Sequence, residues 1–449
     1  MDSGMRADDE GRRNPVRWIM AGITLGVAVN VHALQENYSV GYRGLYTDNV
    51  FLTDKNEQDD WINSALGTLT LQQQGSRLAA NIDTAVEYHD YQKDTRSDDV
   101  FGRLNARGTW IMRPGSLNWQ VEDYFRQTPV TTTNPLQPDN SQYINALFTG
   151  PDVTFRFNRA YSLLSQARYA HTYYQKRKLD NDRLMAAMRL MRGTEGAPVV
   201  NSLNVEAETV DYQDRINEDF DRFDAYWRGE INRQADNVVV ELGGTKIQRD
   251  TNRDITEPLL RTSWRHNISL NEYFQLRATA ENSDAGIYFG RISRLQSEGV
   301  QTSGTNIVNA SIFKSRRASA YYENQGPRLG YNTLLSVNKL IFDTSNLDRL
   351  VSKVRVGLVR PLEGTATVRL NLEAGRIDYR QIDRADDDKR VRLTWGYNPT
   401  QNTLLMLGAG WRKRDSTTQV NSFEALSGFI SFQYGVGDIP NVYIGDPSQ

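Results

Sequence analysis

Charged side chains alternate with apolar ones in several segments of this chain, and this alternation is the main chemical signal in the sequence. In residues 222–232, Arg228 and Glu230 occupy positions between the apolar Trp227 and Ile231. Acids and bases arranged in this way can pair with one another, bind a polar solute or line a water-filled path. The same pattern predicts nine residues of a polar, solute-facing wall: Arg77, Asp83, Glu87, Arg228, Glu230, Arg369, Glu373, Arg390 and Arg392. Because both signs occur together, the pattern favours neither anions nor cations.

The histidines have a second, catalytic interpretation. His89, His171 and His266 lie in separate segments, and no two of them have metal-ligand spacing. A Ser and His dyad would suit lipid hydrolysis, so His171 or His266 could serve in one. A structural polar role is the preferred interpretation, because no G-x-S-x-G, P-loop or H-E-x-x-H motif occurs. We therefore expect no enzyme activity and no cofactor.

Acidic residues gather in runs that could bind a hard cation. Carboxylate oxygens suit Ca²⁺, which could bridge lipopolysaccharide phosphates. No run has the spacing of an EF-hand, so we interpret them as solvated charge in long loops and expect no metal site. The runs are Glu57, Asp59 and Asp60; Asp98 and Asp99; Asp180 and Asp182; Asp219 and Asp221; and Asp386, Asp387 and Asp388.

The elements that would position these residues are long amphipathic strands. Residues 391–397 place Val391, Leu393, Trp395 and Tyr397 on one face, with charged or hydroxyl side chains between them. A pleated strand separates such sets cleanly, whereas a helix would scatter them. Related segments recur about every 36 to 39 residues, near Arg183, Arg222, Pro258, Arg349, Arg390 and Leu426. One face suited to hydrocarbon and one suited to water predict an all-β fold, a transmembrane antiparallel up-and-down β-barrel of about 18–20 strands.

Composition agrees with this fold class. The chain has 449 residues, 39% hydrophobic content, 22 Tyr, no Cys and a formal net charge of -2. The charge gives no general attraction to nucleic acid, and the lack of Cys excludes disulfides and thiol chemistry. The Met-rich run from Leu184 to Met191 could form a helix in isolation, but its neighbours favour a strand.

The connections between strands are of two kinds. The short ones are rich in Gly, Pro and Asn: 74–76, 113–116, 158–160, 234–236, 360–364 and 398–401. The long ones are polar: 47–60, 128–141, 284–315, 382–389 and 415–424. Outer-membrane barrels keep short turns in the periplasm and long loops outside, which predicts strands between Tyr38 and Val436 with both termini periplasmic. Asp284–Ser315 is a loop, a plug or an extra hairpin, since Ala285–Leu295 itself resembles a strand.

The N-terminus predicts export. Arg12, Arg13 and Arg17 precede the apolar run from Trp18 to Val31, which has the features of a secretory signal peptide. The alternative is a single membrane anchor. We therefore expect residues 1–33 to be a signal peptide, 34–436 the barrel and 437–449 a C-terminal periplasmic tail. An exported bacterial barrel belongs in the outer membrane.

Several segments resemble a known family, the porin-like β-barrel proteins of exopolysaccharide biosynthesis and export loci. The resembling segments are Thr149–Asp152 with Phe155–Phe157, Ala167–Tyr169, Leu179–Arg183, and Arg316–Asn324 leading into Gly326–Arg328. The resemblance covers most of the chain after residue 33, and its motifs are structural. Such barrels often end on an aromatic residue that the assembly machinery reads, whereas this chain continues past Phe432 and Tyr434 to Gln449. The resemblance implies passage or secretion of polysaccharide across the outer membrane.

These observations predict a passive conduit. Exopolysaccharide or oligosaccharide would pass through a polar lumen, with Tyr124 and Tyr226 offering apolar faces to sugar rings and 284–315 or another long loop as the gate. The alternatives are a general small-solute porin, a barrel enzyme acting on lipid or glycan, and a structural or adhesive barrel. The expected partners are outer-membrane lipid, lipopolysaccharide, a polysaccharide or polar solute, and envelope export machinery, with no nucleic acid.

Overall fold

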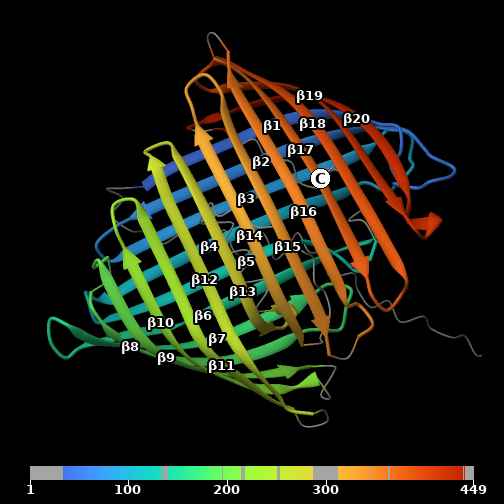
Figure 1. The fold of residues 1–449 in the computed structure, drawn as a ribbon. Helices are drawn as coiled ribbons and strands as arrows, with labels where there is room; N and C mark the ends of the chain where they lie inside the picture. Colours follow the sequence, from blue (N-terminus) through green and yellow to red (C-terminus); the bar gives the residue numbers. More distant parts are fainter. Residues whose placement is uncertain are drawn as a thin grey trace, which may run out of the picture.

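The computed structural model forms one sheet of twenty antiparallel strands (Figure 1). It describes residues 34–437 and 439, apart from 132, 135–139, 195, 214–217, 250–252, 287–311, 344 and 363–364. The strands are β1 (Leu34–Thr47), β2 (Asp60–Gln74), β3 (Leu78–Tyr91), β4 (Asp99–Arg113), β5 (Leu117–Pro129), β6 (Ser141–Arg156), β7 (Tyr161–Tyr174), β8 (Asn181–Arg192), β9 (Val199–Tyr212), β10 (Phe220–Asn232), β11 (Asp236–Arg249), β12 (Ile255–Ser269), β13 (Glu272–Ser283), β14 (Phe313–Gln325), β15 (Gly330–Phe342), β16 (Arg349–Pro361), β17 (Ala366–Tyr379), β18 (Arg384–Thr400), β19 (Thr403–Ser416) and β20 (Phe423–Val436), with a 3-10 turn, η3 (Gln419–Asn421).

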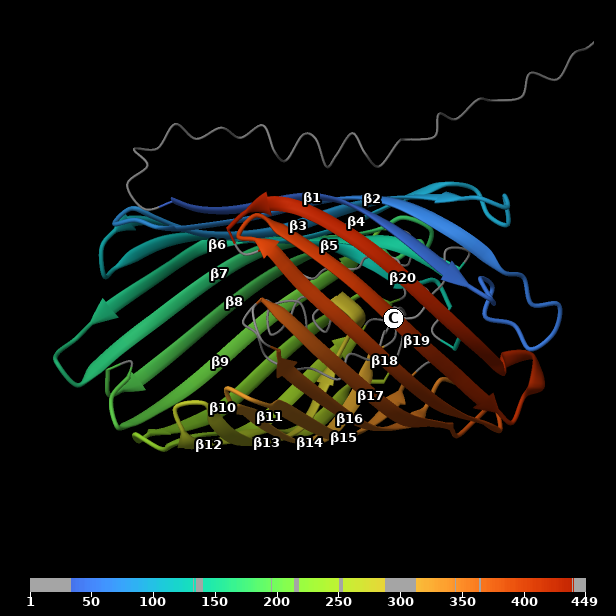
Figure 2. The same cartoon turned by 90° about the horizontal axis from the view of Figure 1, so that it is seen from above.

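The sheet closes on itself. Each strand pairs with its neighbours in sequence, and β1 also pairs with β20, from Tyr38 opposite Val436 to Thr47 opposite Ser427. Closure leaves no free sheet edge, so the strands satisfy each other's backbone donors and acceptors. Figure 2 shows the strands side by side as one wall that curves round on itself. Within the described ranges, no helix is both long and apolar enough to cross a membrane.

The register separates the side chains into two faces. In β1, Tyr38, Val40 and Tyr42 are about half exposed, whereas Ser39 and Arg43, at the alternate positions, are only 2% exposed. Large apolar side chains remain exposed on alternate positions around the barrel, as in β8, β9 and β20. Such an apolar band belongs against hydrocarbon, and the opposite face points to the interior. The predicted transmembrane barrel is confirmed, and it is a protein of the bacterial outer membrane.

The connections agree with the prediction in outline and differ in detail. The turns after the even-numbered strands are short, and Leu34 and Val436 lie at that same end of the barrel. Three predictions were wrong. β1 starts at Leu34 and not at Tyr38, β14 starts at Phe313 and so takes the end of the expected 284–315 loop, and most of the expected 382–389 loop is strand, because β18 begins at Arg384. Leu184–Met191 lies inside β8, which confirms the strand interpretation.

An aspartate closes several of the hairpins at the long-loop end. The Asp180 carboxylate accepts a hydrogen bond from the Tyr174 backbone N–H at 2.7 Å, and Asp219 accepts one from Tyr212 at 2.7 Å. Asp348 does the same for Phe342 at 2.8 Å. Each of these aspartates immediately precedes a strand. A side-chain acceptor at this position fixes the turn, which is ordinary Asp turn chemistry, and it explains why the hairpin signal repeats in the sequence.

Three sequence predictions fall outside the described residues or nearly so. The signal peptide at 1–33 is one. The C-terminal tail at 437–449 is described only at Gly437 and Ile439, and Ile439 packs against a buried apolar cluster that includes Met406 and Phe429. Of the strand-like segment 285–295, only Ala285 and Gly286 are described.

The two faces predict opposite outcomes for neighbouring substitutions in β8. Met188 is 60% exposed on the outer face, whereas Ala187 faces inward and pairs with Glu206. We expect Met188→Arg to destabilise the barrel by about 2–4 kcal/mol, because it places a cation against lipid. Ala187→Arg should be tolerated, because its cation lies beside a carboxylate. The measurement is urea unfolding in lipid vesicles, and equal destabilisation by both variants would contradict the assignment of faces.

Candidate functional site: the inner wall of the barrel

Eight of the nine predicted wall residues lie at equivalent positions of the register. Asp83 and Glu87 in β3, Arg228 and Glu230 in β10, Arg369 and Glu373 in β17, and Arg390 and Arg392 in β18 all occupy the face opposite the exposed apolar side chains. Arg77 lies at the exposed turn between β2 and β3. Their local environments differ. Glu87 is 1% exposed and is packed between Arg43 and His89, whereas Arg390 keeps 28% of its side chain exposed.

Charges on strands β10–β13 form a continuous chain of ion pairs. The Arg228 guanidinium lies 3.0 Å from a Glu230 oxygen and 2.7 Å from one of Glu241, and Arg261 joins Glu241 to Glu281 at 3.1 and 2.6 Å. Cross-strand pairs of this kind hold the side chains in place in a wet interior. On β9–β12 the inward charges are nearly balanced: five cations (Arg222, Arg228, Arg249, Arg261, Arg265) and six carboxylates (Glu206, Glu208, Asp224, Glu230, Glu241, Glu257).

Strands β16–β19 carry a different balance of charge. Their inward face holds nine cations (Arg349, Lys353, Arg355, Arg369, Arg384, Arg390, Arg392, Arg412, Arg414) and three carboxylates (Glu373, Asp386, Asp388). We call this set the cationic wall. One carboxylate, Glu373, is shared by Lys353 at 2.8 Å, Arg355 at 2.9 Å and Arg390 at 3.9 Å. Six of these cations were not among the predicted wall residues, and the alternation of Trp411-Arg412-Lys413-Arg414 could have revealed two of them.

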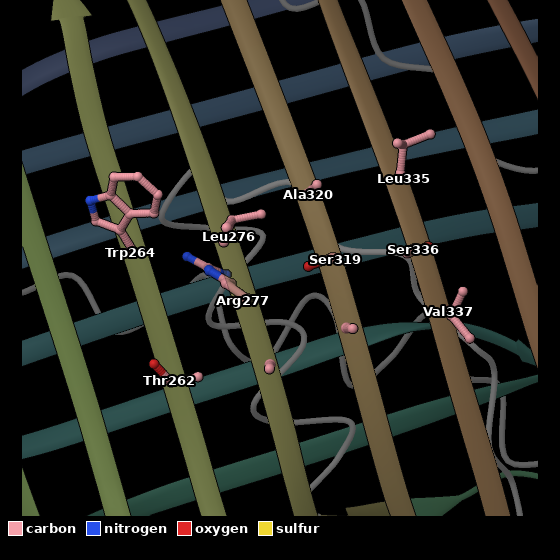
Figure 3. Close-up of a pocket in the computed structure, with 11 residues that line it drawn as sticks. Thr262, Trp264, Leu276, Arg277, Ser319, Ala320, Leu335, Ser336 and Val337 are labelled. Carbon is pink, nitrogen blue, oxygen red and sulfur yellow. The ribbon is translucent and has the colours of Figure 1, made fainter.

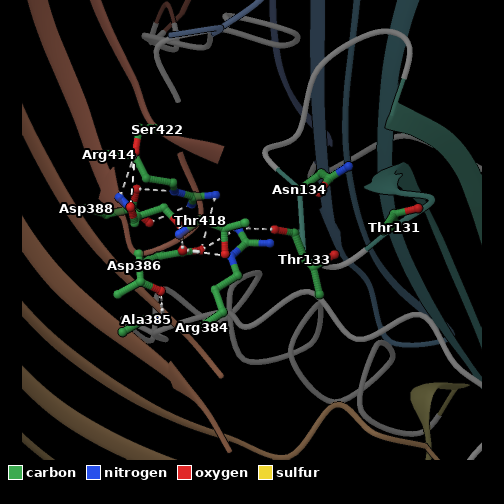
Figure 4. Close-up of polar contacts among 12 residues, drawn as sticks. Thr131, Thr133, Asn134, Arg384, Ala385, Asp386, Asp388, Arg414, Thr418 and Ser422 are labelled. Atoms are coloured by element: carbon green, nitrogen blue, oxygen red, sulfur yellow. Dashed lines mark hydrogen bonds and ion pairs between the residues drawn. The ribbon is translucent and has the colours of Figure 1, made fainter. Parts of the chain in front are cut away.

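At the long-loop end of the barrel, the cationic wall contacts the connection between two distant strands, β5 and β6 (Figure 4). The Arg384 guanidinium, bound by Asp386 at 2.6 Å, donates a hydrogen bond of 2.8 Å to the Thr133 carbonyl oxygen. Thr133 lies between β5 and β6, which are not neighbours of β18 in the sheet. Arg414 completes the group with a 2.7 Å contact to Asp388. Thr133 of the β5–β6 connection therefore lies inside the barrel, against the inner face of β18.

A second contact ties the base of the 284–312 connection to a distant strand. Both oxygens of Asp284, just after β13, accept hydrogen bonds from Arg183 in β8, one of them at 3.1 Å, and Glu208 lies 3.0 Å from the same guanidinium. All three side chains are buried. A Cβ at position 286 would come within 2.5 Å of the Arg183 guanidinium, so Gly286 permits the close approach.

Apolar side chains fill part of the interior beside this contact. Tyr124, Ile144, Val210 and Ile247 form a buried cluster with Ile312, which immediately precedes β14. The burial of these apolar side chains helps to fix the base of the 284–312 connection, in addition to the ion pairs of Arg183. Tyr124 lies in this cluster with its hydroxyl bonded to Glu122 at 2.9 Å, so it offers no open face to a sugar. The Tyr226 hydroxyl donates to Glu206 at 2.5 Å.

The two catalytic candidates, His171 and His266, lie on the outer face of the barrel. His171 faces outward near the long loops, where its Nδ1 is 2.9 Å from Asp182, and His266 faces outward at the opposite end, 2.9 Å from Asp236. Within the described part of the chain, neither ring is hydrogen-bonded to a serine hydroxyl. His89 faces inward and packs on Phe101 with ring centroids 4.4 Å apart. The geometry therefore assembles no Ser and His dyad in these ranges.

The acidic runs are not confined to loops, contrary to our prediction. Asp386, Asp387 and Asp388 form the beginning of β18, and Asp60, Asp99, Asp182 and Asp221 also lie in strands. In the β1–β2 connection, Asp59 lies 2.6 Å from Lys93, and the hydrogen bond from Lys93 lowers the pKa of that carboxyl. Across the described ranges, no group of three or more His, Asp or Glu side chains could hold a metal ion.

A shallow apolar groove of about 540 Å³ lies on β12–β15 (Figure 3). Small side chains such as Ala278, Ala318 and Ala320 form its floor, and Trp264, Leu335 and Val337 flank it. These residues belong to the outward face, so the groove meets the membrane and not the interior. It takes no part in the inner wall.

Comparisons with known proteins give likeness of fold. No protein-family model and no curated protein matches the chain. Among solved structures, it is similar to OccK2 (OpdF) of Pseudomonas aeruginosa in complex with glucuronate, with 10% identity and a TM-score of 0.38 over 90% of this chain and 99% of that one. A BenF-like porin from Pseudomonas fluorescens Pf-5 has 11% identity and a TM-score of 0.40 over 90% and 99%. A mutant of the ferric enterobactin receptor PfeA from Pseudomonas aeruginosa has 9% identity and a TM-score of 0.47 over 89% and 80%.

The buried Arg183 contact predicts a stability effect. Arg183→Met should lower stability by about 3–5 kcal/mol, because it leaves Asp284 and Glu208 buried without their cation. The triple variant with Asp284→Asn and Glu208→Gln should recover part of the loss, because the uncompensated charges are gone. The temperature at which the folded electrophoretic band disappears in detergent measures both. A triple variant less stable than Arg183→Met would contradict the explanation.

Proposed function

We propose that this protein is an outer-membrane channel that passes exopolysaccharide or oligosaccharide through its polar interior. The observation that carries the proposal is the inner wall, which presents ionised side chains from the short-turn end to the long-loop end. A barrel of twenty strands exceeds the size at which porins enclose an aqueous path. A charged inner wall in so wide a barrel suits water and a hydrophilic solute.

Aromatic side chains on the inner face support a saccharide as the solute. Near the short-turn end, Tyr273 of β13 and Tyr321 of β14 lie with ring centroids 5.7 Å apart, and both hydroxyls donate to Glu323, at 2.7 and 2.9 Å. Tyrosine combines an apolar ring with a polar tip. A carboxylate beside such rings can accept hydrogen bonds from sugar hydroxyls. Tyr321 is only 7% exposed and Arg265 covers one face of the Tyr273 ring at 3.8 Å, so the partly exposed Tyr273 is the ring that a saccharide at the short-turn end would contact.

A general small-solute porin is the second candidate, and the balanced ion pairs of β9–β12 favour it. Paired charges stabilise the wall without committing it to one solute. The two candidates differ in the cell. Loss of an export channel would reduce extracellular polysaccharide and leave polymer in the periplasm, whereas loss of a porin would slow uptake of small solutes and leave polysaccharide unchanged.

Two measurements test the proposal. Purified protein in a planar bilayer should give stepwise single-channel currents, and a strain lacking the gene should secrete less polysaccharide, with recovery from a plasmid copy. If the purified protein conducts but the deletion strain secretes a normal amount of polysaccharide, the general porin is the remaining candidate. Zero conductance in the wild type and in variants shortened in each long loop would contradict both candidates.

The contact between Arg384 and Thr133 predicts a change in the current. Arg384→Gln removes the 2.8 Å hydrogen bond that holds the β5–β6 connection against β18. We expect noisier single-channel currents of larger mean size, because the connection loses an anchor across the interior. Arg376→Gln is the matched control, since Arg376 lies on the outward face of the adjacent strand, paired with Asp387 at 3.2 Å. Identical currents from wild type and Arg384→Gln would show that this contact does not limit the path.

A further inference from the structure

We infer that the cationic wall of β16–β19 is the path taken by the solute, and that the solute is anionic: a saccharide bearing carboxylate, phosphate or sulfate groups. The inference rests on the proposed channel and specifies its substrate class. The sequence as a whole contains nearly equal numbers of acids and bases, but the folded barrel distributes them unequally over its inner face. Nine cations meet three carboxylates on β16–β19, whereas β9–β12 carry five cations and six carboxylates.

The ion pairs inside the cationic wall leave a surplus of positive charge. Glu373 has one negative charge for three cations within 3.9 Å. Asp386 and Asp388 contact Arg384 and Arg414. Pairing with the wall's own carboxylates therefore cannot neutralise the whole set. Excess cations beside a low-dielectric wall concentrate anions and repel cations.

The cations extend along the direction of transport. On β18, Arg384 lies at the long-loop end, and Arg390 and Arg392 follow on the same face, with Arg412 of β19 opposite Arg390. From Arg384 to Arg392 the strand covers about 26 Å at the usual rise per residue. Arg369 of β17 continues the set toward the short-turn end, opposite Thr394. Arg384 and Arg412 are buried, whereas Arg390, Arg392 and Arg369 are partly exposed and could contact a passing anion in turn.

The exposure and chemistry of these side chains suit transient contact. The side chains of Arg355 and Arg390 are 32% and 28% exposed, so they remain accessible beside their shared carboxylate. Guanidinium groups bind carboxylate and phosphate oxygens in pairs, which orients the anion without a fully enclosed site. Repeated sites of this kind allow an ion to enter and leave. Arg384, at the long-loop end of the set, is buried and holds Thr133, so it positions the β5–β6 connection beside these sites.

Ion selectivity in a planar bilayer tests the inference. Under a KCl gradient, the wild type should show a reversal potential of the sign expected when chloride carries most of the current. Arg390→Gln with Arg392→Gln should shift this potential toward the potassium side. Lys389→Gln with Lys413→Gln is the matched control, because it removes the same charge from the outward face of β18 and β19 and should cause no shift. Glu373→Gln should keep or strengthen the preference for chloride, so the test does not depend on one variant folding.

Current block identifies the substrate class. Galacturonate oligomers should block the wild-type current more strongly than malto-oligosaccharides of equal length, and the double Arg variant should lose the difference. Comparing block of the current by galacturonate monomer with block by the oligomers distinguishes a channel for small anions from a channel for an anionic polymer. A conducting but unselective or potassium-selective wild type, or an equal shift in the Lys control, would overturn this inference and leave the channel standing. No conductance at all would overturn the channel and this inference together.

Discussion

The structure depends on one constraint: in a bilayer, every backbone donor and acceptor must find its partner within the protein. The pairing of β1 with β20 meets that constraint by removing the last free edges. A closed antiparallel sheet then forces side chains to alternate between hydrocarbon and interior, with a period of two. The half-exposed Tyr42 beside the buried Arg43 is the local expression of this rule.

The same constraint explains why charge is concentrated inside. The outer face must be apolar, so the ionised side chains of the strands lie mainly on the inner face, where they need partners or water. Pairs such as Arg261 with Glu281 meet this need between neighbouring strands. Arg183 and Arg384 instead bind the connections at Asp284 and Thr133, so buried guanidinium groups also shape the interior. The remaining surplus on β16–β19 makes that part of the wall suited to anions.

Much of the fold could be predicted from the sequence, because alternation is a local property. It correctly indicated the barrel, the strand nature of Leu184–Met191 and twenty strands as the upper end of the expected range. It failed at Asp386-Asp387-Asp388, which resembles a solvated loop. In β18, Asp386 faces inward to Arg384, Asp387 faces outward to Arg376 and Asp388 faces inward to Arg414, so each charge has a partner. Those partners come from other strands or from two residues away, and composition does not reveal them.

The site was less predictable because it depends on which strands are neighbours. The placement of eight of the nine predicted residues follows from alternation, whereas Arg77 lies at a turn. The charge surplus is seen only when the inward residues of four strands are counted together. The contact between Arg384 and Thr133 joins residues 251 positions apart, and no local pattern predicts it. Tyr124 was expected to face a sugar, but it lies in a cluster with residues of several strands.

Accessibility of introduced cysteines tests the central claim most directly, namely that alternate residues face water and lipid. The chain has no native Cys, so each single Cys variant carries one thiol. In β17, Asn371 faces inward and is exposed, whereas Leu370 and Leu372 face outward. With the protein in lipid vesicles, a charged maleimide should label Asn371→Cys and leave Leu370→Cys and Leu372→Cys unlabelled until detergent is added. Equal labelling of all three, or labelling of the two leucine positions alone, would contradict the account.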